Sequence, residues 1–171
     1  MQNVFTQYLQ QHNIDPRSGL GKELFLFVSS LTPIVNVDLL VYNKQGQFLL
    51  TRRDDPYCGR GWHVPGGCIR FKESSEERVR LVAKNELGIT HISFDQTPIK
   101  IFEIIDNRHR PIANQNERAH FITLVYKCRV DSSYLINNGE LKEDDVGFIK
   151  WFDKLPEDLI SIQNCYRQIL K

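Results

Sequence analysis

Two segments decide the fold of this chain: Gly66-Gly67-Cys68-Ile69-Arg70-Phe71-Lys72-Glu73 and Asn85-Glu86-Leu87-Gly88-Ile89. The first indicates a glycine turn followed by a short apolar strand, and the second indicates the end of a helix. We expect that helix to begin at Ser74. Its hydroxyl can accept a hydrogen bond from the Glu77 N–H while the Glu77 carboxylate reaches back, which is a capping box. Gly88 is suited to end the helix.

Glu86 is the unusual residue of this predicted helix. It comes four residues after Val82 and three after Ala83, so it continues the apolar stripe that faces the core. A buried carboxylate needs a cation as a partner, either an arginine, with Arg53 and Arg80 as candidates, or a metal ion. The glycine turn beside the helix favours the metal. Mg²⁺ usually takes one or two protein carboxylates and completes its shell with water and substrate phosphate oxygens.

The spacing of these segments resembles the Nudix box, the signature of the Nudix hydrolase superfamily. The positions that match the pattern are Gly67, Glu73, Glu86, Gly88 and Ile89. The arginine of the family falls on Leu81, and two of its glutamates fall on Val82 and Asn85. Because these carboxylates are missing, we infer a single Mg²⁺ ion held by Glu86 and the backbone carbonyl of Gly67. A substrate diphosphate is needed to complete its shell.

Within this superfamily the chain resembles the GDP-mannose mannosyl hydrolases, an atypical branch with an incomplete box. The resemblance covers residues 32–89, through Thr32-Pro33, Val37-Asp38 and residues 49–53, 61–67 and 86–88. It implies Mg²⁺-dependent cleavage of the sugar carbon–oxygen bond in a nucleoside diphosphate sugar, which releases nucleoside diphosphate and sugar. It also implies that Asp38 contacts the sugar and that Arg53 contacts the diphosphate.

Two positions depart from that branch. Its phosphate-binding arginine falls on Cys68, and Arg70, two residues later on the same side of a strand, can substitute for it. Its general-base histidine falls on Val146. Asp145 falls where the branch has a metal-contacting side chain, so we assign Asp145 as a metal ligand and as the base. Other candidates for the base are Glu143, Asp144, Glu103 and His120.

The composition indicates one soluble domain with a sizeable core, since the chain has 171 residues, of which 41% are hydrophobic and 25% charged. A formal net charge of +1 gives no general attraction to nucleic acid. No apolar run approaches the roughly 20 residues of a membrane span, and no signal-peptide pattern is present. We therefore expect a cytoplasmic protein without a membrane partner. The cysteines are then reduced and structural: Cys58, Cys68, Cys128 and Cys165.

Helical spacing over residues 4–9 and 20–31, with a break at residues 15–19, predicts an N-terminal helical arm over residues 1–31. Residues 32–171 are the predicted Nudix domain, with its box at 67–89. The expected strands are 34–42, 47–52, 92–94, 99–105, 121–130 and 148–152, and a last helix is expected to open at Pro156. Helices among mostly antiparallel strands predict an α+β fold, the α/β/α sandwich with a mixed sheet that the resemblance implies.

Three functions are compatible with these residues. Besides the nucleoside diphosphate sugar hydrolase, a generic Nudix pyrophosphatase would attack phosphorus in another nucleoside diphosphate derivative, although the missing box glutamates favour attack at the sugar carbon. The third is a nucleotide-binding module without turnover, because both customary bases are absent from their expected positions. Loops such as residues 106–118 determine which base and sugar are recognised. The arm either packs across a homodimer, as in the resembling branch, or forms an intramolecular lid.

Overall fold

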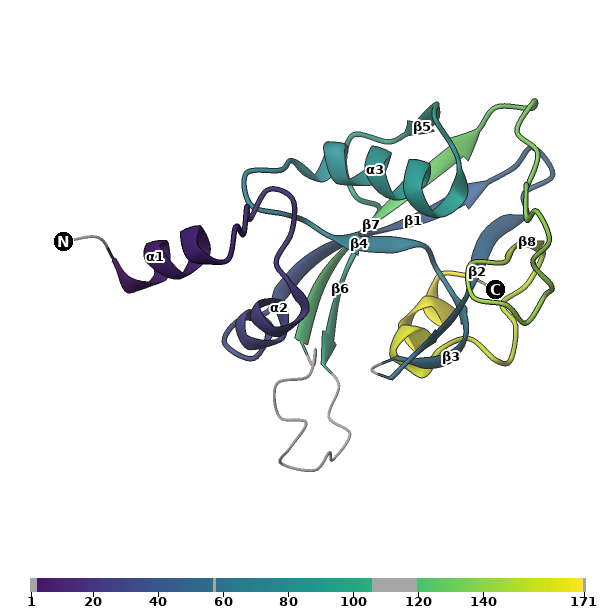
Figure 1. Cartoon of the computed structure of the whole chain (residues 1–171). Helices are drawn as coiled ribbons and strands as arrows, with labels where there is room; N and C mark the ends of the chain where they lie inside the picture. Colours follow the sequence, from purple (N-terminus) through teal and green to yellow (C-terminus); the bar gives the residue numbers. More distant parts are fainter. Residues whose placement is uncertain (1–2, 57, 106–119, 171) are drawn as a thin grey trace.

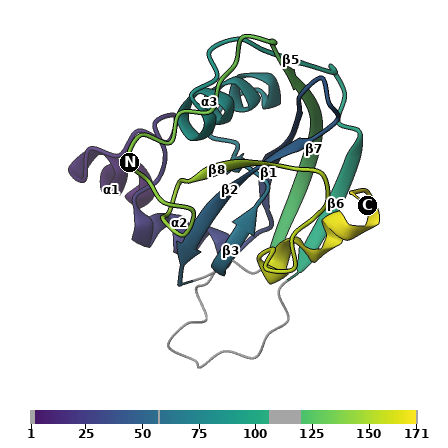
Figure 2. The same cartoon turned by 90° about the vertical axis from the view of Figure 1, so that its right-hand side faces the viewer.

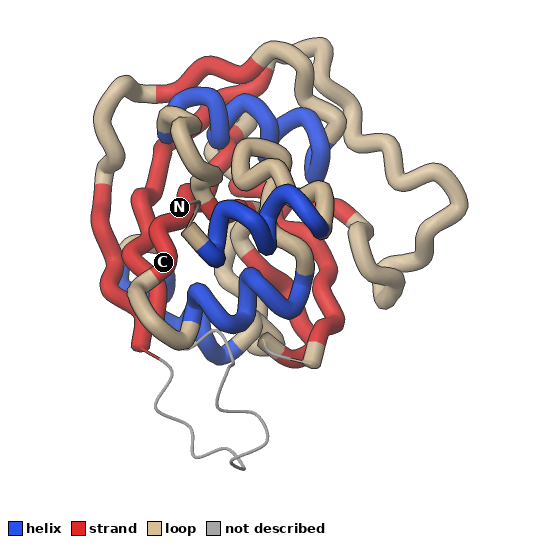
Figure 3. Tube along the Cα trace, turned by 60° about the vertical axis from the view of Figure 1, so that its left-hand side comes forward, coloured by secondary structure: helices blue, strands red, loops and turns tan. Residues whose placement is uncertain are grey.

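The computed structural model describes residues 3–56, 58–105 and 120–170. Two short helices, α1 (Val4–Gln11) and α2 (Lys22–Ser29), lie where the arm is expected. No residue of α1 is buried, and α1 projects away from the sheet (Figure 1). In a view from the side of the arm, these two helices and α3 (Ser75–Leu87) lie in front of the strands (Figure 3). None of the helices in the described residues has the length and apolar character needed to cross a bilayer.

The centre of the fold is an eight-stranded sheet with the order β3-β2-β1-β7-β5, in which β4 also pairs with β1, β6 with β7 and β8 with β2. Strands β1 and β7 run parallel, and the other strand pairs within the described residues are antiparallel. The predicted mixed, mostly antiparallel sheet is therefore confirmed. The strands are β1 (Ile34–Tyr42), β2 (Phe48–Asp55), β3 (Gly59–His63), β4 (Gly66–Cys68), β5 (Ile92–Phe94), β6 (Lys100–Ile105), β7 (His120–Val130) and β8 (Ile149–Phe152).

The sheet has a core on each face, because the side chains of β1 alternate between its two sides. Val37, Leu39 and Val41 belong to the core that includes α3. Leu40 belongs to the opposite core, together with Tyr166 from the 3₁₀ helix η2 (Ser161–Gln168). Figure 2 shows α3 and the yellow C-terminal helix on opposite sides of the strands. This arrangement is the expected α/β/α sandwich.

The prediction of a glycine turn at Gly66-Gly67 is wrong, because residues Gly66–Cys68 form strand β4, which pairs with β1. The glycines are needed for close approach. A Cβ atom on Gly66 would lie 2.0 Å from Asp38 Oδ1, and one on Gly67 would lie 3.0 Å from Val82 Cγ2. The strand expected after the glycines does not form, and the chain turns instead at Lys72, which has a φ of 60°.

The last helix also differs from the expectation, since η2 begins at Ser161 rather than at Pro156. The segment before it pairs with β3 through backbone hydrogen bonds. The Trp62 N–H donates to the Asp158 carbonyl at 2.9 Å, and the Ile160 N–H donates to the Trp62 carbonyl at 2.9 Å. Backbone groups used in this way are not available for helical hydrogen bonds, so the helix starts later.

Candidate active site

Helix α3 positions Glu86, and both of its ends form as the sequence predicts. The Glu77 N–H donates to Ser74 Oγ at 3.2 Å, and the Ser74 N–H donates to Glu77 Oε2 at 2.7 Å, which confirms the capping box. Its hydrogen bonds with Ser74 lower the pKa of the exposed Glu77 carboxyl. Gly88 ends the helix with a φ of 66°.

Glu73 fixes the segment between β4 and α3, and its partner is one that the sequence reasoning missed. Its Oε2 accepts hydrogen bonds from the Arg70 N–H and from Arg78 Nε, both at 2.8 Å. Arg78 is buried, and its Nη2 lies 2.7 Å from the same oxygen. The arginine of the family pattern falls on Leu81, which is exposed, and Arg78 lies one turn earlier on the same helix. The one-turn spacing between Arg78 and position 81 is the feature of the sequence that could have identified Arg78 as the partner of Glu73.

The Glu86 side chain is 33% exposed, and its Oε2 lies 3.6 Å from His63 Nε2. Arg80, one of the two expected partners, instead lies over the Phe94 ring with its Cζ 4.9 Å from the ring centroid. Glu86 faces a cleft that we call the outer cleft, which Arg53, Gly67 and ten other residues line. Glu86, Arg53 and Gly67 therefore line the same cleft, as the sequence analysis expects.

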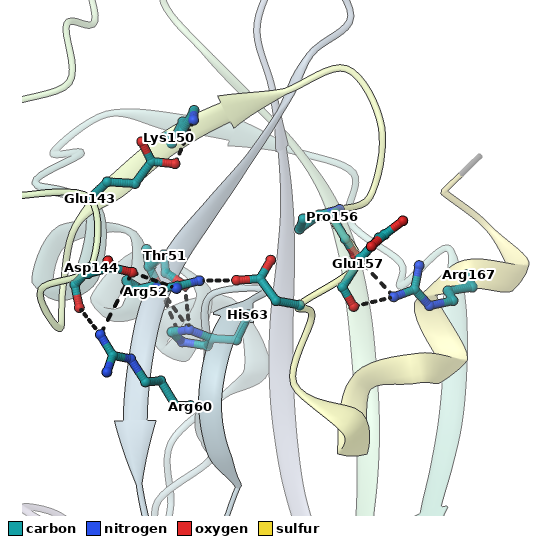
Figure 4. A network of polar contacts seen from close by, with 11 residues as sticks. Thr51, Arg52, Arg60, His63, Glu143, Asp144, Lys150, Pro156, Glu157 and Arg167 are labelled. Atoms are coloured by element: carbon teal, nitrogen blue, oxygen red, sulfur yellow. Dashed lines mark hydrogen bonds and ion pairs between the residues drawn. The ribbon is translucent and has the colours of Figure 1, made fainter.

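His63, at the end of β3, had no role in the sequence prediction. It is buried, and it pairs with Thr51 across β2 and β3. Its Nδ1 lies 2.9 Å from the Thr51 carbonyl oxygen, and Figure 4 shows the ring against Thr51. A carbonyl oxygen can only accept a hydrogen bond, so Nδ1 carries the proton.

Asp38 is almost fully buried, at 3% exposure, and it is held by residues distant in the sequence. Its Oδ2 accepts hydrogen bonds from the Tyr166 hydroxyl at 2.7 Å and from Gln163 Nε2 at 3.3 Å, and its Oδ1 accepts one from Asn36 Nδ2 at 2.9 Å. Burial raises the pKa of Asp38 to about 7, although the Tyr166 hydrogen bond opposes this rise and the negative charge of Glu86 adds to it. Asp38 is therefore a carboxyl that can change its charge near neutral pH.

Asp38 faces a second hollow, the inner pocket, which is lined mainly by β1, β3, β4, β7 and the residues around η2. The inner pocket and the outer cleft share Arg53, His63, Gly66, Gly67 and Cys68. The two hollows therefore adjoin each other at these residues. The Glu86 carboxylate lies on one side of the shared residues, and the Asp38 carboxyl lies on the other.

Arg52 anchors the loop that borders the outer cleft. It forms ion pairs with Asp144, at 2.8 Å (Figure 4), and with Asp158. Its guanidinium lies over the Trp62 ring, 5.1 Å from the centroid. The Arg52 carbonyl also accepts the Gly147 N–H at 2.9 Å. Arg52 is thus held in a structural network, whereas Arg53 borders both hollows.

Two predicted site residues are not brought to this site. Asp145 Oδ2 accepts a hydrogen bond from the Lys142 N–H at 2.7 Å within an exposed turn, and Asp145 lines neither hollow. Arg70 follows the end of β4 rather than lying on a strand, because its N–H is bound by Glu73. Its guanidinium lies beside the arm, where a Cβ atom on Gly19 would be 3.5 Å from Arg70 Nε.

The alternative base candidates lie elsewhere as well. His120 Nε2 is 3.1 Å from Glu103 Oε1, and this pair lies on β7 and β6 with the Glu103 side chain 61% exposed. Lys150 Nζ pairs with Glu143 at 2.7 Å (Figure 4). The loop predicted to recognise base and sugar, residues 106–118, lies outside the described residues.

The donor atoms at the cleft suit one hard cation. Within the described part of the chain, no three acidic, histidine or cysteine side chains gather into a metal-binding group. Glu86 lines this cleft with a carboxylate and Asn85 with an amide, and the backbone of Gly67 borders it. Oxygen donors of this number fit Mg²⁺, which keeps waters and takes its other ligands from substrate phosphates.

Comparisons with known proteins agree with this architecture. Residues 32–162 match the family model described as the NUDIX domain. The MutT NUDIX hydrolase structure from Burkholderia pseudomallei is 23% identical in sequence to this chain. The match covers 80% of this chain and 97% of the Burkholderia chain, with a TM-score of 0.54. The structure of a possible asymmetric diadenosine tetraphosphate hydrolase from Jonesia denitrificans is 17% identical. That match covers 71% of this chain and 77% of the Jonesia chain, with a TM-score of 0.51. Both likenesses concern the fold.

A curated relative matches a shorter region. The low-salt glycan biosynthesis protein Agl8 of Haloferax volcanii is 37% identical over 57 residues. These residues are 33% of this chain and 36% of Agl8, so the match spans about a third of the length of that relative.

Proposed function

The chain belongs to the Nudix family, and on this premise we propose that it is a Mg²⁺-dependent hydrolase of nucleoside diphosphate sugars that releases nucleoside diphosphate and free sugar. The observation that carries the proposal is that Glu86 lines the outer cleft, Asp38 lines the inner pocket, and Arg53 borders both. The short match to Agl8, a glycan biosynthesis protein, supports a sugar-containing substrate.

The outer cleft suits the diphosphate. Glu86 and the carbonyl of Gly67 would hold the ion there, and the guanidinium of Arg53 would bind phosphate oxygens through its planar set of N–H donors. When bound, Mg²⁺ supplies positive charge that stabilises the departing diphosphate. Because a diphosphate stabilised in this way is a good leaving group, the site needs no general acid.

The inner pocket suits one polar edge of the sugar, since its volume of about 60 Å³ is too small for a whole ring. Asp38 and Asn36 line it with polar atoms, while Phe121 and Ile104 add apolar surface. The Thr123 hydroxyl donates to Asn36 Oδ1 at 3.0 Å, and this bond fixes the Asn36 amide. A fixed set of buried polar groups discriminates strongly against ligands that fail to pair with it.

The mechanism also needs a general base to activate water, and the sequence analysis assigned this role to Asp145. Asp38 is better suited, because it faces the inner pocket and its pKa of about 7 is close to the best value for a general base at neutral pH. Three hydrogen bonds occupy three of the roughly four acceptor positions of a carboxylate, so one position remains for a water molecule. We therefore propose Asp38 as the base in place of Asp145.

The test is hydrolysis of a panel of nucleoside diphosphate sugars with Mg²⁺ in oxygen-18 water. We expect the label in the released sugar, since attack at carbon breaks the sugar carbon–oxygen bond. Label in a phosphate product would mean attack at phosphorus and would support the generic pyrophosphatase. Nucleotide binding without hydrolysis of any member of the panel would support the binding module.

We also propose that the arm forms a homodimer contact. On α1, Val4, Phe5 and Tyr8 are 74%, 70% and 40% exposed, and this apolar surface needs a partner. A Phe5→Glu substitution should convert a dimer into a monomer, as measured by light scattering, while Gln7→Glu on the same exposed helix should leave the mass unchanged. A monomeric wild-type protein would refute the contact.

A further inference from the structure

His63 is a buried side chain to which the proposed reaction gives no part. It borders both the inner pocket and the outer cleft, and its side chain is 8% exposed. Its Nδ1 donates to the Thr51 carbonyl at 2.9 Å, which fixes both the ring orientation and the tautomer. In the neutral ring Nε2 is then an acceptor with an unshared electron pair.

The Thr51 hydroxyl does not use this electron pair. It lies 3.0 Å from Nδ1 and 3.2 Å from Nε2, so it is nearly equidistant from the two ring nitrogens. A donor placed along the Nε2 electron pair would lie far beyond hydrogen-bond distance of Nδ1, because the two nitrogens point in diverging directions. The Nε2 electron pair therefore remains available at the cleft.

Glu86 is the side chain that faces His63 there. Its Oε2 lies 3.6 Å from His63 Nε2, which is longer than a hydrogen bond. Two electron-pair donors at this separation repel each other slightly unless a cation lies between them. Two neighbouring ligands of one octahedral ion, each about 2.1 Å from it, lie about 3 Å apart. A small rotation of the Glu86 side chain, which is one-third exposed, would close that difference.

We propose that this site also accepts a divalent first-row transition metal in place of Mg²⁺, bound by His63 Nε2 together with Glu86 Oε2, so that a nitrogen ligand is added to the carboxylate. This rests on the proposed function only in locating the ion at Glu86. The Thr51 carbonyl supports it, because a metal-binding histidine almost always donates its other N–H to a carboxylate, a backbone carbonyl or water. Imidazole suits Co²⁺ and similar ions better than Mg²⁺.

Pulsed electron paramagnetic resonance of Mn²⁺ tests this directly. Tag-free protein with Mn²⁺ and inorganic pyrophosphate should show ¹⁴N modulation from one coordinated imidazole. His63→Gln should remove the modulation, whereas His91→Gln, an exposed histidine beyond α3, should retain it. A wild-type spectrum without ¹⁴N modulation overturns the proposal, as does modulation that survives in His63→Gln.

Calorimetric titration with Co²⁺ and with Mg²⁺ gives a second readout. The loss of the imidazole should weaken Co²⁺ binding about 10–100-fold and change Mg²⁺ binding much less. Equal losses for both ions would mean that His63 supports Glu86 without contacting the metal, which also overturns the proposal. Because both readouts are metal binding, they stand even if no nucleoside diphosphate sugar is hydrolysed. Failure of the proposed function and failure of this metal site are therefore distinguishable.

Discussion

The buried carboxyl of Asp38 should make the stability of the fold depend on pH in a defined direction. Its pKa is raised from 3.8 to about 7 by burial, so between these values the folded state holds a proton that the unfolded chain has lost. The contribution of Asp38 to the free energy of unfolding therefore falls as pH rises from 4 to 7 and becomes constant above the folded pKa. The stabilising contribution is complete only below pH 4.

The size of the effect follows from the shift. About three pKa units, at roughly 1.4 kcal/mol each, give an upper value of about 4 kcal/mol. The Asp38→Asn variant lacks this proton, so it should lack this part of the pH dependence. It should also be less stable at low pH by about 1–3 kcal/mol, because an amide cannot accept from Asn36, Gln163 and Tyr166 together.

Urea unfolding at several values between pH 4 and 8 measures both effects. The stability of wild type relative to Asp38→Asn should fall by up to about 4 kcal/mol as pH rises from 4 to 7, so the variant becomes the more stable protein if the full effect is realised. Asp95→Asn, on the exposed surface, should follow the wild-type curve. A difference between wild type and Asp38→Asn that stays constant over this range would refute the inference that burial dominates the ionisation of Asp38.

Three further predictions concern the residues around the cleft. Gly66→Ala should cost about 1–3 kcal/mol or more in thermal or urea unfolding, because its Cβ would meet Asp38 Oδ1, whereas Gly21→Ala, with no atom within 4 Å, should be tolerated. Arg78→Met should cost about 3–5 kcal/mol, because the largely buried Glu73 carboxylate would keep the Arg70 N–H but lose its guanidinium partner, and a loss below 1 kcal/mol would contradict the structural role of this pair. Glu86→Gln should abolish Mg²⁺-dependent turnover with an unchanged circular dichroism spectrum, while Glu76→Gln in the exposed first turn should retain turnover.

The parts of the site that the sequence predicted are those set by local patterns. The capping box at Ser74 and the stop at Gly88 follow from spacing within one helix, and the structure contains both, whereas Glu86, expected on the buried face, is one-third exposed at the outer cleft. Arg78 was missed although it lies on the same helix, because the family pattern directed attention to Leu81. A search for any arginine one turn from that position would have found it.

The parts that were missed depend on contacts between distant segments. The burial of Asp38 requires Gln163 and Tyr166, more than a hundred residues away, and no local pattern reveals which strand face η2 covers. The role of His63 depends on its register with Thr51, which is set by the pairing of β2 with β3. Asp145 was assigned from an aligned loop position, but its carboxylate binds the Lys142 N–H of its own turn.

The close packing of Gly66 against Asp38 has an evolutionary consequence. The two residues are partners across β1 and β4, and the aspartate oxygen fills the space that any larger residue at 66 would need. Residue 66 therefore cannot gain a side chain while Asp38 is present, so homologous chains with aspartate at position 38 should also carry glycine at position 66. An Asp38→Ala background should relieve only part of the cost of Gly66→Ala, because the new Cβ would still lie 2.8 Å from the Val37 carbonyl oxygen, and a double-mutant cycle would measure this coupling.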